Sequence, residues 1–271
     1  MAWASAREGE GRTALITGAS SGIGESLAHG FAASGHGLVL VARSKAKLAA
    51  LAKTLKAAHC SRVTVLPVDL ALAGAAQALA AALQRKRIAI DVLVNNAGVL
   101  EQGAFSAMPA QRHQQLIDLN VSGLTAMLAT FVPSMVERGF GRVLNVASIA
   151  AFQPVPTLAT YAATKAYVLS LTESLGEELK GSGVTATALF PGITATGMLS
   201  SAVQANAQLG KLPGFMVGDV DEVAAAGYAA CMRDEVIKVP GEINLAATLA
   251  ARAAPKWLLR RVAGMVSRKG L

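Results

Sequence analysis

Tyr161 and Lys165 are the two side chains in this sequence whose types and spacing best suit acid–base chemistry. They are four residues apart in a segment of helical pattern, so both leave the same face of that helix. A phenol with a pKa of about 10 exchanges protons poorly at neutral pH. An adjacent ammonium favours the phenolate and brings its pKa towards the working range, and Ser148, at the end of an apolar run, can donate to a substrate oxygen. The Tyr-x-x-x-Lys pair alone is a weak signal, because it often occurs by chance on exposed helices.

A glycine-rich turn follows the first apolar run of the chain and opens a helical segment. Gly18, Gly22 and Gly24 let the backbone approach a pyrophosphate, while the helix N-terminus offers free N–H groups and a positive dipole end. Ser20 and Ser21 can add hydroxyl donors. The turn therefore predicts a dinucleotide phosphate site.

The end of the second apolar run indicates which dinucleotide would bind. A site that prefers NAD usually has an acidic residue there, which binds the ribose 2′-hydroxyl. Here Ala42 is followed by Arg43, Ser44 and Lys45, so nothing would repel a 2′-phosphate. Because Arg43 can pair with that phosphate bidentately, we expect NADP(H).

Seven short apolar runs alternate with longer segments of helical pattern, as in α/β proteins. The runs lack the alternation of half-exposed strands, so we expect parallel strands buried on both faces of one sheet. The expected strands cover residues 13–17, 38–42, 62–67, 91–94, 142–146, 184–189 and 235–239. The predicted fold is α/β, a single doubly wound Rossmann-type domain with about seven parallel strands, with its ligands at the carboxyl ends of the strands.

No linker-like stretch interrupts the interior of the chain, so one large domain is expected. We predict an N-terminal extension over residues 1–11, a dinucleotide-binding catalytic domain over 12–245 and a basic, helical C-terminal tail over 246–271. Two further strand ends carry polar or small residues. Asp69 could hydrogen-bond an adenine amino group, and the turn Asn96-Ala97-Gly98 lets the backbone approach a ribose.

Taken together, these motifs resemble the classical short-chain dehydrogenase/reductase family. The matching residues are Thr17-Gly-x3-Gly-Ile-Gly24, Asp69, Asn95-Asn-Ala-Gly98, Asn120, Ser148, Tyr161-x3-Lys165 and Pro191-Gly192, in the family's order and at its usual spacings over about residues 10–245. Their joint occurrence is highly specific. The resemblance implies an oxidoreductase that transfers hydride between a nicotinamide and a carbonyl or alcohol carbon. Arg43 and the reduced state of cellular NADP pools favour carbonyl reduction.

The resemblance also implies roles for individual residues. The expected catalytic residues are Asn120, Ser148, Tyr161 and Lys165, with Asn120 bending a helix and holding a water that links Lys165 to solvent. The expected cofactor contacts are Gly18, Ser20, Ser21, Gly22, Ile23, Gly24, Arg43, Ser44, Asp69, Leu70, Asn96, Ala97, Gly98, Tyr161, Lys165, Pro191, Gly192, Ile193 and Thr194, the last two at the carboxamide. No metal ligands are expected, because the four histidines lack ligand spacing.

Substrate and assembly are less constrained by the sequence. The segment 193–218 and the loop after Ser148 are rich in apolar residues: Met198, Leu199, Val203, Leu209, Leu212, Phe215 and Met216 in the first, and Ile149, Phe152, Pro154, Val155 and Leu158 in the second. They predict a pocket for a small apolar carbonyl or alcohol compound, such as a fatty-acyl, steroid-like or aromatic ketone, or else simply pack a lid on the core. The resemblance implies a homodimer or homotetramer formed through helices at about 111–138 and 160–180.

Two other functions share this fold. Epimerases and dehydratases of nucleotide sugars use the same Tyr/Lys pair, but they are typically longer and have a second lobe for which this chain has little room. A catalytically silent NADP(H)-sensing binding protein would need the cofactor residues but not the intact set Asn120, Ser148, Tyr161 and Lys165.

Composition and charge favour a cytoplasmic location. The chain is 53% hydrophobic and 15% charged, its two cysteines have no motif, and it has neither a signal-like N-terminus nor a long uninterrupted apolar stretch. Of the net charge of +8, six positive charges follow Glu242, so the basicity belongs to the tail and does not indicate specific nucleic-acid binding. A basic amphipathic helix after Pro255 could contact an anionic membrane peripherally, pack on a neighbouring subunit or face water.

Overall fold

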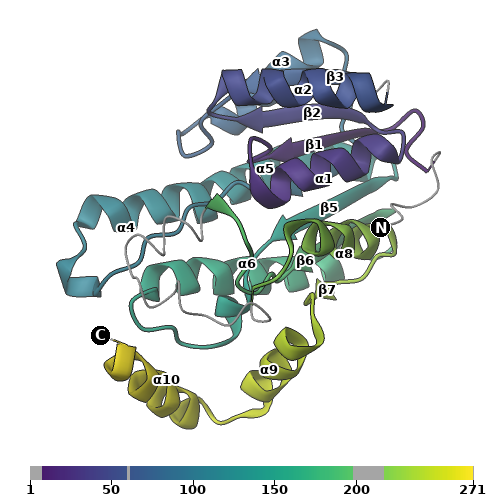
Figure 1. Cartoon of the computed structure of the whole chain (residues 1–271). Coiled ribbons are helices and arrows are strands. Elements are labelled where there is room, and N and C mark those ends of the chain that lie inside the picture. The colour runs from purple at the N-terminus through teal and green to yellow at the C-terminus, as the bar shows by residue number, and fades with distance from the viewer. Residues whose placement is uncertain (1–7, 60–61, 198–216, 271) are drawn as a thin grey trace.

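The computed structural model describes residues 8–59, 62–197 and 217–270, which form a parallel sheet covered by helices on both faces (Figure 1). The strands are β1 (Thr13–Thr17), β2 (Gly37–Ala42), β3 (Val63–Pro67), β4 (Val92–Asn95), β5 (Gly141–Val146), β6 (Val184–Leu189) and β7 (Ile237–Lys238). Their order is β3-β2-β1-β4-β5-β6-β7, and every neighbouring pair is parallel. The predicted doubly wound sheet is confirmed.

Helices cover both faces of the sheet, and the last two form an arm beside it. The helices are α1 (Gly22–Ala33), α2 (Lys45–His59), α3 (Ala75–Arg85), α4 (Ala110–Ile117), α5 (Leu124–Glu137), α6 (Ala159–Glu178), α8 (Val220–Met232), α9 (Glu242–Ala253) and α10 (Lys256–Gly270). Short turns of 3-10 helix, η1 (Phe105–Ala107) and η3 (Ile149–Phe152), lie in the connecting loops. Side chains of α1, α2 and α8 form one core layer, and those of α3, α5 and α6 form the other.

Alternate residues of each central strand enter opposite core layers, which explains the uniformly apolar runs. In β1, Leu15 faces the α3, α5 and α6 layer, whereas Ala14 and Ile16 face the other layer. All three side chains are fully buried. A strand covered on both faces has no polar side, so its sequence shows no alternation.

The chain reverses its direction of winding at β1. From β1 it proceeds to β2 and β3 on one side and then returns to form β4 on the other side of β1. A doubly wound sheet has its ligand crevice at this switch point, beyond the carboxyl ends of the strands. The ends of β1 and β4 therefore fix where the functional site must lie.

Two predicted elements differ in detail from the structure. The strand expected over 235–239 contains only Ile237 and Lys238, because the left-handed backbone at Asp234 turns the chain just before it and Pro240, which has no N–H, follows closely. The long helix expected over 111–138 is interrupted by a π-helical turn, η2 (Asp118–Gly123). The stretch Ala110–Glu137 is long and apolar enough to cross a membrane by length and composition, but in this fold α5 contributes its apolar side chains to the core.

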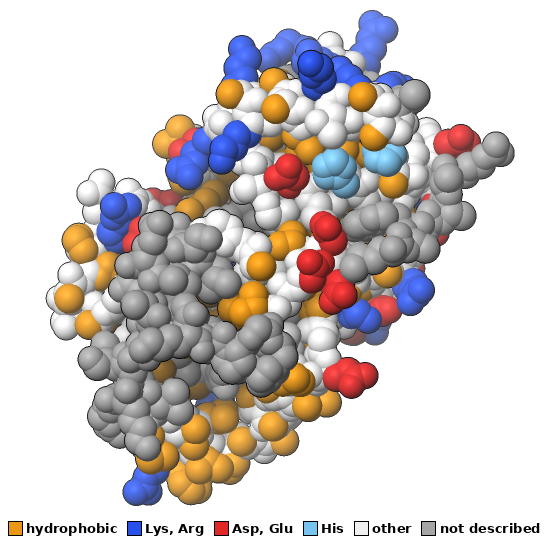
Figure 2. All heavy atoms as spheres, viewed as in Figure 1, with side chains coloured by type: hydrophobic (Ala, Val, Ile, Leu, Met, Phe, Trp, Pro, Cys, Tyr) orange, Lys and Arg blue, Asp and Glu red, His pale blue; other side chains and the backbone are white. Residues whose placement is uncertain are grey.

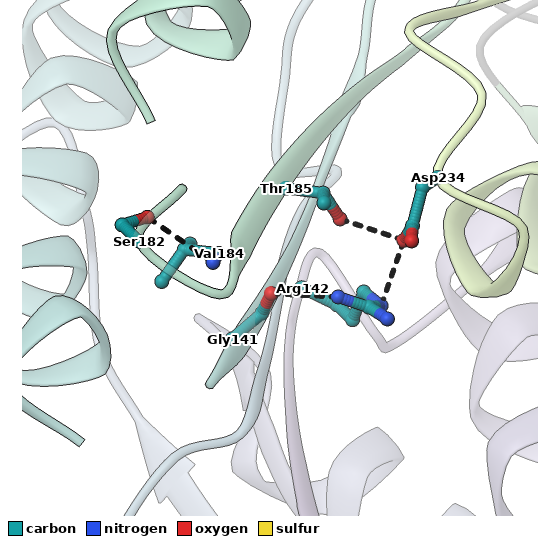
Figure 3. Close-up of polar contacts among 6 residues, drawn as sticks. All are labelled: Gly141, Arg142, Ser182, Val184, Thr185 and Asp234. Atoms are coloured by element: carbon teal, nitrogen blue, oxygen red, sulfur yellow. Dashed lines mark hydrogen bonds and ion pairs between the residues drawn. The ribbon is translucent and has the colours of Figure 1, made fainter. Parts of the chain in front are cut away.

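A polar cluster fastens the turn after α8 to the amino ends of β5 and β6 (Figure 3). The guanidinium of Arg142 lies 3.0 Å from the Asp234 carboxylate, and the Thr185 hydroxyl donates to the same carboxylate at 3.0 Å. Ser182 Oγ accepts from the backbone N–H of Val184 at 3.2 Å and shapes the entry to β6. These contacts lie at the end of the sheet opposite the switch-point crevice, so they stabilise the scaffold rather than the site.

His36, just before β2, is a fully buried imidazole in an apolar environment. Its ring meets Phe31 edge-on, with centroids 5.1 Å apart, and lies against Gly9. A hydrogen bond with the Phe31 backbone favours the protonated ring, but its effect is smaller than that of burial. Burial lowers the pKa of His36 to about 4, so the folded protein holds this side chain neutral over most of the acidic range.

The resulting prediction concerns stability against pH. Because the unfolded chain protonates His36 near its ordinary pKa of 6.5 and the folded chain only near 4, stability falls as pH falls between these values. Between pH 7 and pH 5 the loss from this group is about 2 kcal/mol. His36→Leu should remove that part of the decline, measured by urea unfolding at the two pH values, while His59→Gln on the exposed end of α2 should not. An unchanged decline in the His36 variant would refute the assignment.

Candidate active site

A single cavity of about 720 Å³ lies at the carboxyl ends of the strands and brings the predicted residues together. The predicted cofactor residues that line it are Gly18, Ser20, Ser21, Gly22, Ile23, Arg43, Ser44, Asp69, Leu70, Asn96, Ala97, Gly98, Tyr161, Lys165, Pro191, Gly192, Ile193 and Thr194. Ser148 lines it as well. Gly24 and Asn120 do not, and both lie behind the wall and shape it.

The glycine turn after β1 leaves room for a phosphate at the N-terminus of α1. Ser21 caps this helix in extended conformation without a side-chain hydrogen bond to it. Gly18 has a φ of 63°, and a Cβ there would lie 2.7 Å from Asn96 Nδ2 and 2.9 Å from Ala97 Cα. A side chain at that position is excluded, so the backbone itself forms the floor of the cradle. The turn fits a pyrophosphate in the way that the sequence predicts.

Gly24 serves the packing of the same turn. A Cβ at this position would collide with the carbonyl of Gly18 and with the Asn96 amide. Its lack of a side chain lets the first turn of α1 lie against the end of β1. Gly24 therefore supports the turn without lining the cavity.

Cations and hydroxyls gather where β2 ends. Arg43 and Ser44 line the cavity together with Lys47, whereas Lys45, which the sequence placed beside them, does not. Lys47 was missed by sequence reasoning, although it follows Arg43 at the four-residue spacing that puts two side chains on one side of a helix start. After the end of β3, the Asp69 carboxylate accepts a hydrogen bond from the Ala71 N–H at 3.1 Å, which fixes its orientation.

Tyr161 and Lys165 lie deep in the wall formed by α6, with 7% and 6% of their surfaces exposed. Lys165 Nζ is 5.7 Å from the centre of the Tyr161 ring and donates to the Val146 carbonyl at 3.0 Å. Gly98 brings the backbone of the β4 turn close to them, since a Cβ there would be 3.6 Å from Lys165 Nζ. Ser148 hydrogen-bonds with Tyr161 and accepts the Ala150 N–H at 3.2 Å.

Burial dominates the proton affinities of this pair. It raises the pKa of Tyr161, while the hydrogen bond with Ser148 acts in the opposite direction, and it lowers the pKa of Lys165 to about 8. The sequence predicts that Lys165 and a positively charged nicotinamide together lower the pKa of this phenol. The protein groups alone do not lower it, because removing the phenolate from water costs more than the Ser148 hydrogen bond returns. Lys165, in contrast, can exchange a proton close to neutral pH.

Asn120 lies in the π-helical turn η2 and holds the loop beside the catalytic pair. Its Oδ1 accepts the Val99 N–H at 2.9 Å, and its Nδ2 donates to the Val99 carbonyl at 2.9 Å and to Thr164 Oγ1 at 3.2 Å. The wider π turn is the bend that the resemblance implied at this position. The water relay assigned to Asn120 stays a prediction.

The half of the cavity beyond Tyr161 is mainly apolar. Val99, Leu100, Ile149, Val155 and Leu158 line it. Of the other apolar residues predicted there, Phe152 packs against Phe190 with centroids 4.7 Å apart, and neither Phe152 nor Pro154 reaches the cavity. Met198, Leu199, Val203, Leu209, Leu212, Phe215 and Met216 lie outside the described residues.

Two amides interrupt this apolar wall. Gln102 and Gln153 line the cavity, and sequence reasoning singled out neither of them. The Oε1 atom of Gln102 is buried and accepts no hydrogen bond from any described residue. A buried acceptor of this kind costs free energy unless a bound molecule donates to it.

Comparisons with known proteins agree with this geometry. Residues 12–207 match the family model described as short chain dehydrogenase. A 2-dehydro-3-deoxy-L-rhamnonate dehydrogenase (NAD(+)) of Sphingomonas sp. is 36% identical over 79% of this chain and 86% of its own. A short-chain dehydrogenase from Sphingobium yanoikuyae, solved in complex with NADPH, is 36% identical, with a TM-score of 0.79 over 89% of this chain and 93% of its own.

A bulky-bulky ketone specific alcohol dehydrogenase from Comamonas testosteroni is 31% identical, with a TM-score of 0.75 over 90% of this chain and 95% of its own. The matched family, the parallel sheet and the Ser148, Tyr161 and Lys165 cluster in one cavity agree with one another. The chain therefore belongs to the short-chain dehydrogenase family and is a nicotinamide-dependent dehydrogenase or reductase acting on alcohol or carbonyl groups.

Proposed function

We propose that this protein is an NADP(H)-dependent reductase of hydrophobic carbonyl compounds. The observation that carries the proposal is the position of Tyr161 between the two halves of one cavity. On one side lie the glycine turn and the cations after β2, and on the other lie the apolar residues of the β4 and β5 loops. A cofactor in the first half and a substrate in the second would meet at the phenol.

The protein groups divide the work of the reaction. A nicotinamide cofactor, when bound, would supply the hydride. Ser148 donates a hydrogen bond to the carbonyl oxygen and stabilises the charge that develops there, while Tyr161 transfers its proton to that oxygen. Lys165, with its pKa lowered to about 8, stabilises the phenolate that remains. Carbonyl reduction suits a phenol whose pKa is raised by burial, because that phenol enters the reaction protonated.

Charge at the end of β2 supports NADP(H) over NAD(H). Arg43 and Lys47 both line the cavity there, next to the hydroxyl of Ser44, and the cavity wall between β2 and α2 carries no carboxylate. A 2′-phosphate would meet two cations and a hydroxyl donor in this region. The relative from Sphingobium yanoikuyae binds NADPH, whereas the one from Sphingomonas sp. is named for NAD(+), so the relatives by themselves leave the choice open.

The chain also fits a homo-oligomer, in line with its family. Ile117, Val136 and Tyr167, on α4, α5 and α6, expose between 37% and 40% of their surfaces on the helices that the resemblance assigns to the subunit interface. We propose a homodimer or homotetramer formed through these helices, in the cytoplasm.

Tyr161→Phe tests the mechanism. Removing the hydroxyl eliminates the proton donor but keeps the ring in its buried position. Turnover of a ketone should therefore fall by about 10²-fold to 10⁴-fold, which is the usual contribution of a general acid. The NADPH affinity of the variant should stay within about threefold of the wild-type value, because the substitution does not change the phosphate-binding turn. Tyr167→Phe, on the same helix but outside the cavity lining, removes a hydroxyl that contacts Thr125; it is the matched control and should retain most of the activity. Substantial activity in the Tyr161 variant would overturn its role.

A wild-type protein that binds NADPH tightly but turns over nothing in a broad carbonyl panel would favour the catalytically silent NADP(H)-sensing protein.

Arg43→Ala tests the cofactor preference. Loss of a charge-assisted pair with the 2′-phosphate should weaken NADPH binding by about 10-fold to 100-fold and leave NADH binding nearly unchanged. Lys45→Ala removes a neighbouring cation that does not line the cavity and should have little effect on either affinity. Both affinities can be measured by fluorescence titration. Equal losses for the two cofactors, or a wild-type preference for NADH, would show that no 2′-phosphate binds here.

Gln102→Leu tests the polar element of the substrate half. We expect the natural substrate to donate a hydrogen bond to the Gln102 amide, so the variant should lose about 10-fold in kcat/KM for a hydroxylated ketone and little for its deoxy analogue. The ratio of the two kcat/KM values is the readout. Glu101→Gln, which changes the neighbouring side chain paired with Arg112, should leave that ratio unchanged. An equal loss for both ketones would indicate a packing role for Gln102.

A further inference from the structure

The chain leaves the catalytic domain after β7 as an arm of two helices, α9 and α10, which run along one side of the body (Figure 1). The arm is tied down at α9, where Arg252 lies 3.5 Å from Glu173 and 5.7 Å from the centre of the Phe152 ring. Among the described residues, no side chain of α10 makes a hydrogen bond or an ion pair with the domain.

α10 carries an apolar stripe that the described part of the chain leaves partly exposed. Leu258, Val262 and Met265 expose 39%, 46% and 48% of their surfaces. Their spacing of four and then three residues places them on one face of the helix. Apolar side chains of α9, including Leu245 and Leu249, are also exposed, and Figure 2 shows hydrophobic side chains gathered along the edge of the molecule where the arm lies. An exposed apolar patch of this kind indicates a surface that binds a protein or a membrane.

The charge of the arm selects the kind of surface. Six cations and no acidic residue follow Glu242: Arg252, Lys256, Arg260, Arg261, Arg268 and Lys269. On the α-helical wheel, Arg261 flanks the apolar stripe, while Lys256 and Arg260 lie on the opposite face, and all three are exposed. Cations on the polar side of an exposed apolar stripe are typical of helices that lie in the interface of an anionic bilayer.

A second copy of the chain offers a poorer match to this charge. Six of the eight net positive charges lie in the arm itself, and the rest of the chain has a net charge of about +2 (8 − 6), so a neighbouring subunit would offer these cations no excess of negative charge. Three side chains of the stripe bury too little area for stable binding by the hydrophobic effect alone. Apolar contact and electrostatic attraction must act together, and an anionic lipid surface supplies both.

We propose that α10 is a peripheral membrane-binding helix that docks the enzyme on anionic lipid, with Leu258, Val262 and Met265 inserted at the headgroup level. The docking is independent of the reaction, because no described residue of α9 or α10 belongs to the cavity lining. A membrane-bound state would place the enzyme beside hydrophobic substrates that partition into lipid, but the proposal does not depend on which substrate is reduced.

Vesicle co-sedimentation of the full-length protein tests the proposal. Binding should be clear with vesicles of phosphatidylcholine containing about one-third phosphatidylglycerol, weak with pure phosphatidylcholine, and greatly reduced at high salt, as expected for a surface potential that salt screens. Equal binding to both vesicle types, or no binding to either, would overturn the proposal.

Paired variants locate the binding surface. Arg260→Gln with Arg261→Gln should weaken binding by about 30-fold, from the contribution of each basic residue near an anionic surface. Val262→Ser with Met265→Ser should weaken it as well, because the stripe is lost while the charge stays. Lys53→Gln with Lys56→Gln, an equal charge change on exposed positions of α2, is the matched control and should bind nearly as well as the wild type.

NADPH affinity, measured on every variant, reports that the domain remains folded. If the Lys53/Lys56 control loses as much binding as the Arg260/Arg261 variant, the attraction is that of a generally basic protein and α10 is not the site. If the α10 variants instead dissociate an oligomer seen by sedimentation velocity, while the wild type ignores anionic vesicles, a second copy covers the stripe and the membrane assignment is wrong. None of these outcomes depends on turnover, so failure here leaves the proposed reaction untouched.

Discussion

One buried hydroxyl, that of Thr17, joins the two strands between which the site is built. Its Oγ1 donates to the Val94 carbonyl at 3.1 Å and accepts the N–H groups of Asn96 and Ala97 at 2.9 Å each. The Asn96 amide returns hydrogen bonds to the carbonyls of Thr17 and Gly18. Since β1 and β4 lie on either side of the switch point, this network fixes the crevice in which phosphate cradle and catalytic wall face each other.

Further side-chain hydrogen bonds between neighbouring elements hold polar groups inside the apolar sheet. The Asn95 amide donates to Asn145 at 2.9 Å, and the Asn145 amide donates to Thr172 at 2.9 Å, which links β4 and β5 to α6. Buried amides without such partners would destabilise the core. Through this chain of hydrogen bonds, the helix that carries Tyr161 and Lys165 is positioned against the strand ends.

Burial has a different effect on each group of the site. It raises the pKa of Tyr161 and keeps that phenol protonated, lowers the pKa of Lys165 to about 8, and raises the pKa of the Cys231 thiol to about 12 in the core under α8. The first two groups lie on the wall of a cavity and can respond to a charged ligand, whereas the thiol is inert. The same low polarity thus produces reactivity in one place and simple packing in another.

The sequence by itself determined the sheet, its parallel strands and the identity of the catalytic side chains. Buried parallel strands need continuous apolar runs, and close approach to a phosphate needs glycines. Both features depend on residues that are adjacent in the sequence, so they can be recognised without the structure. The turn residues 18–24 could be found from their spacing and their place after the first apolar run, and the pair Tyr161 and Lys165 from its occurrence together with the other motifs. All but Gly24 among these predicted contacts line the cavity.

Only the tertiary structure decided which neighbouring residues enter the site. Lys47 and not Lys45 lines the cavity, and the buried amide oxygen of Gln102 has no hydrogen-bond partner in the described part of the chain. Both outcomes depend on how α2 and the β4 loop are packed against the sheet. The direction of the Tyr161 pKa shift likewise follows from burial that no spacing reveals. The basic tail was visible in the sequence, but whether its apolar stripe is covered depends on contacts between distant parts of the chain, and the fold leaves that stripe exposed.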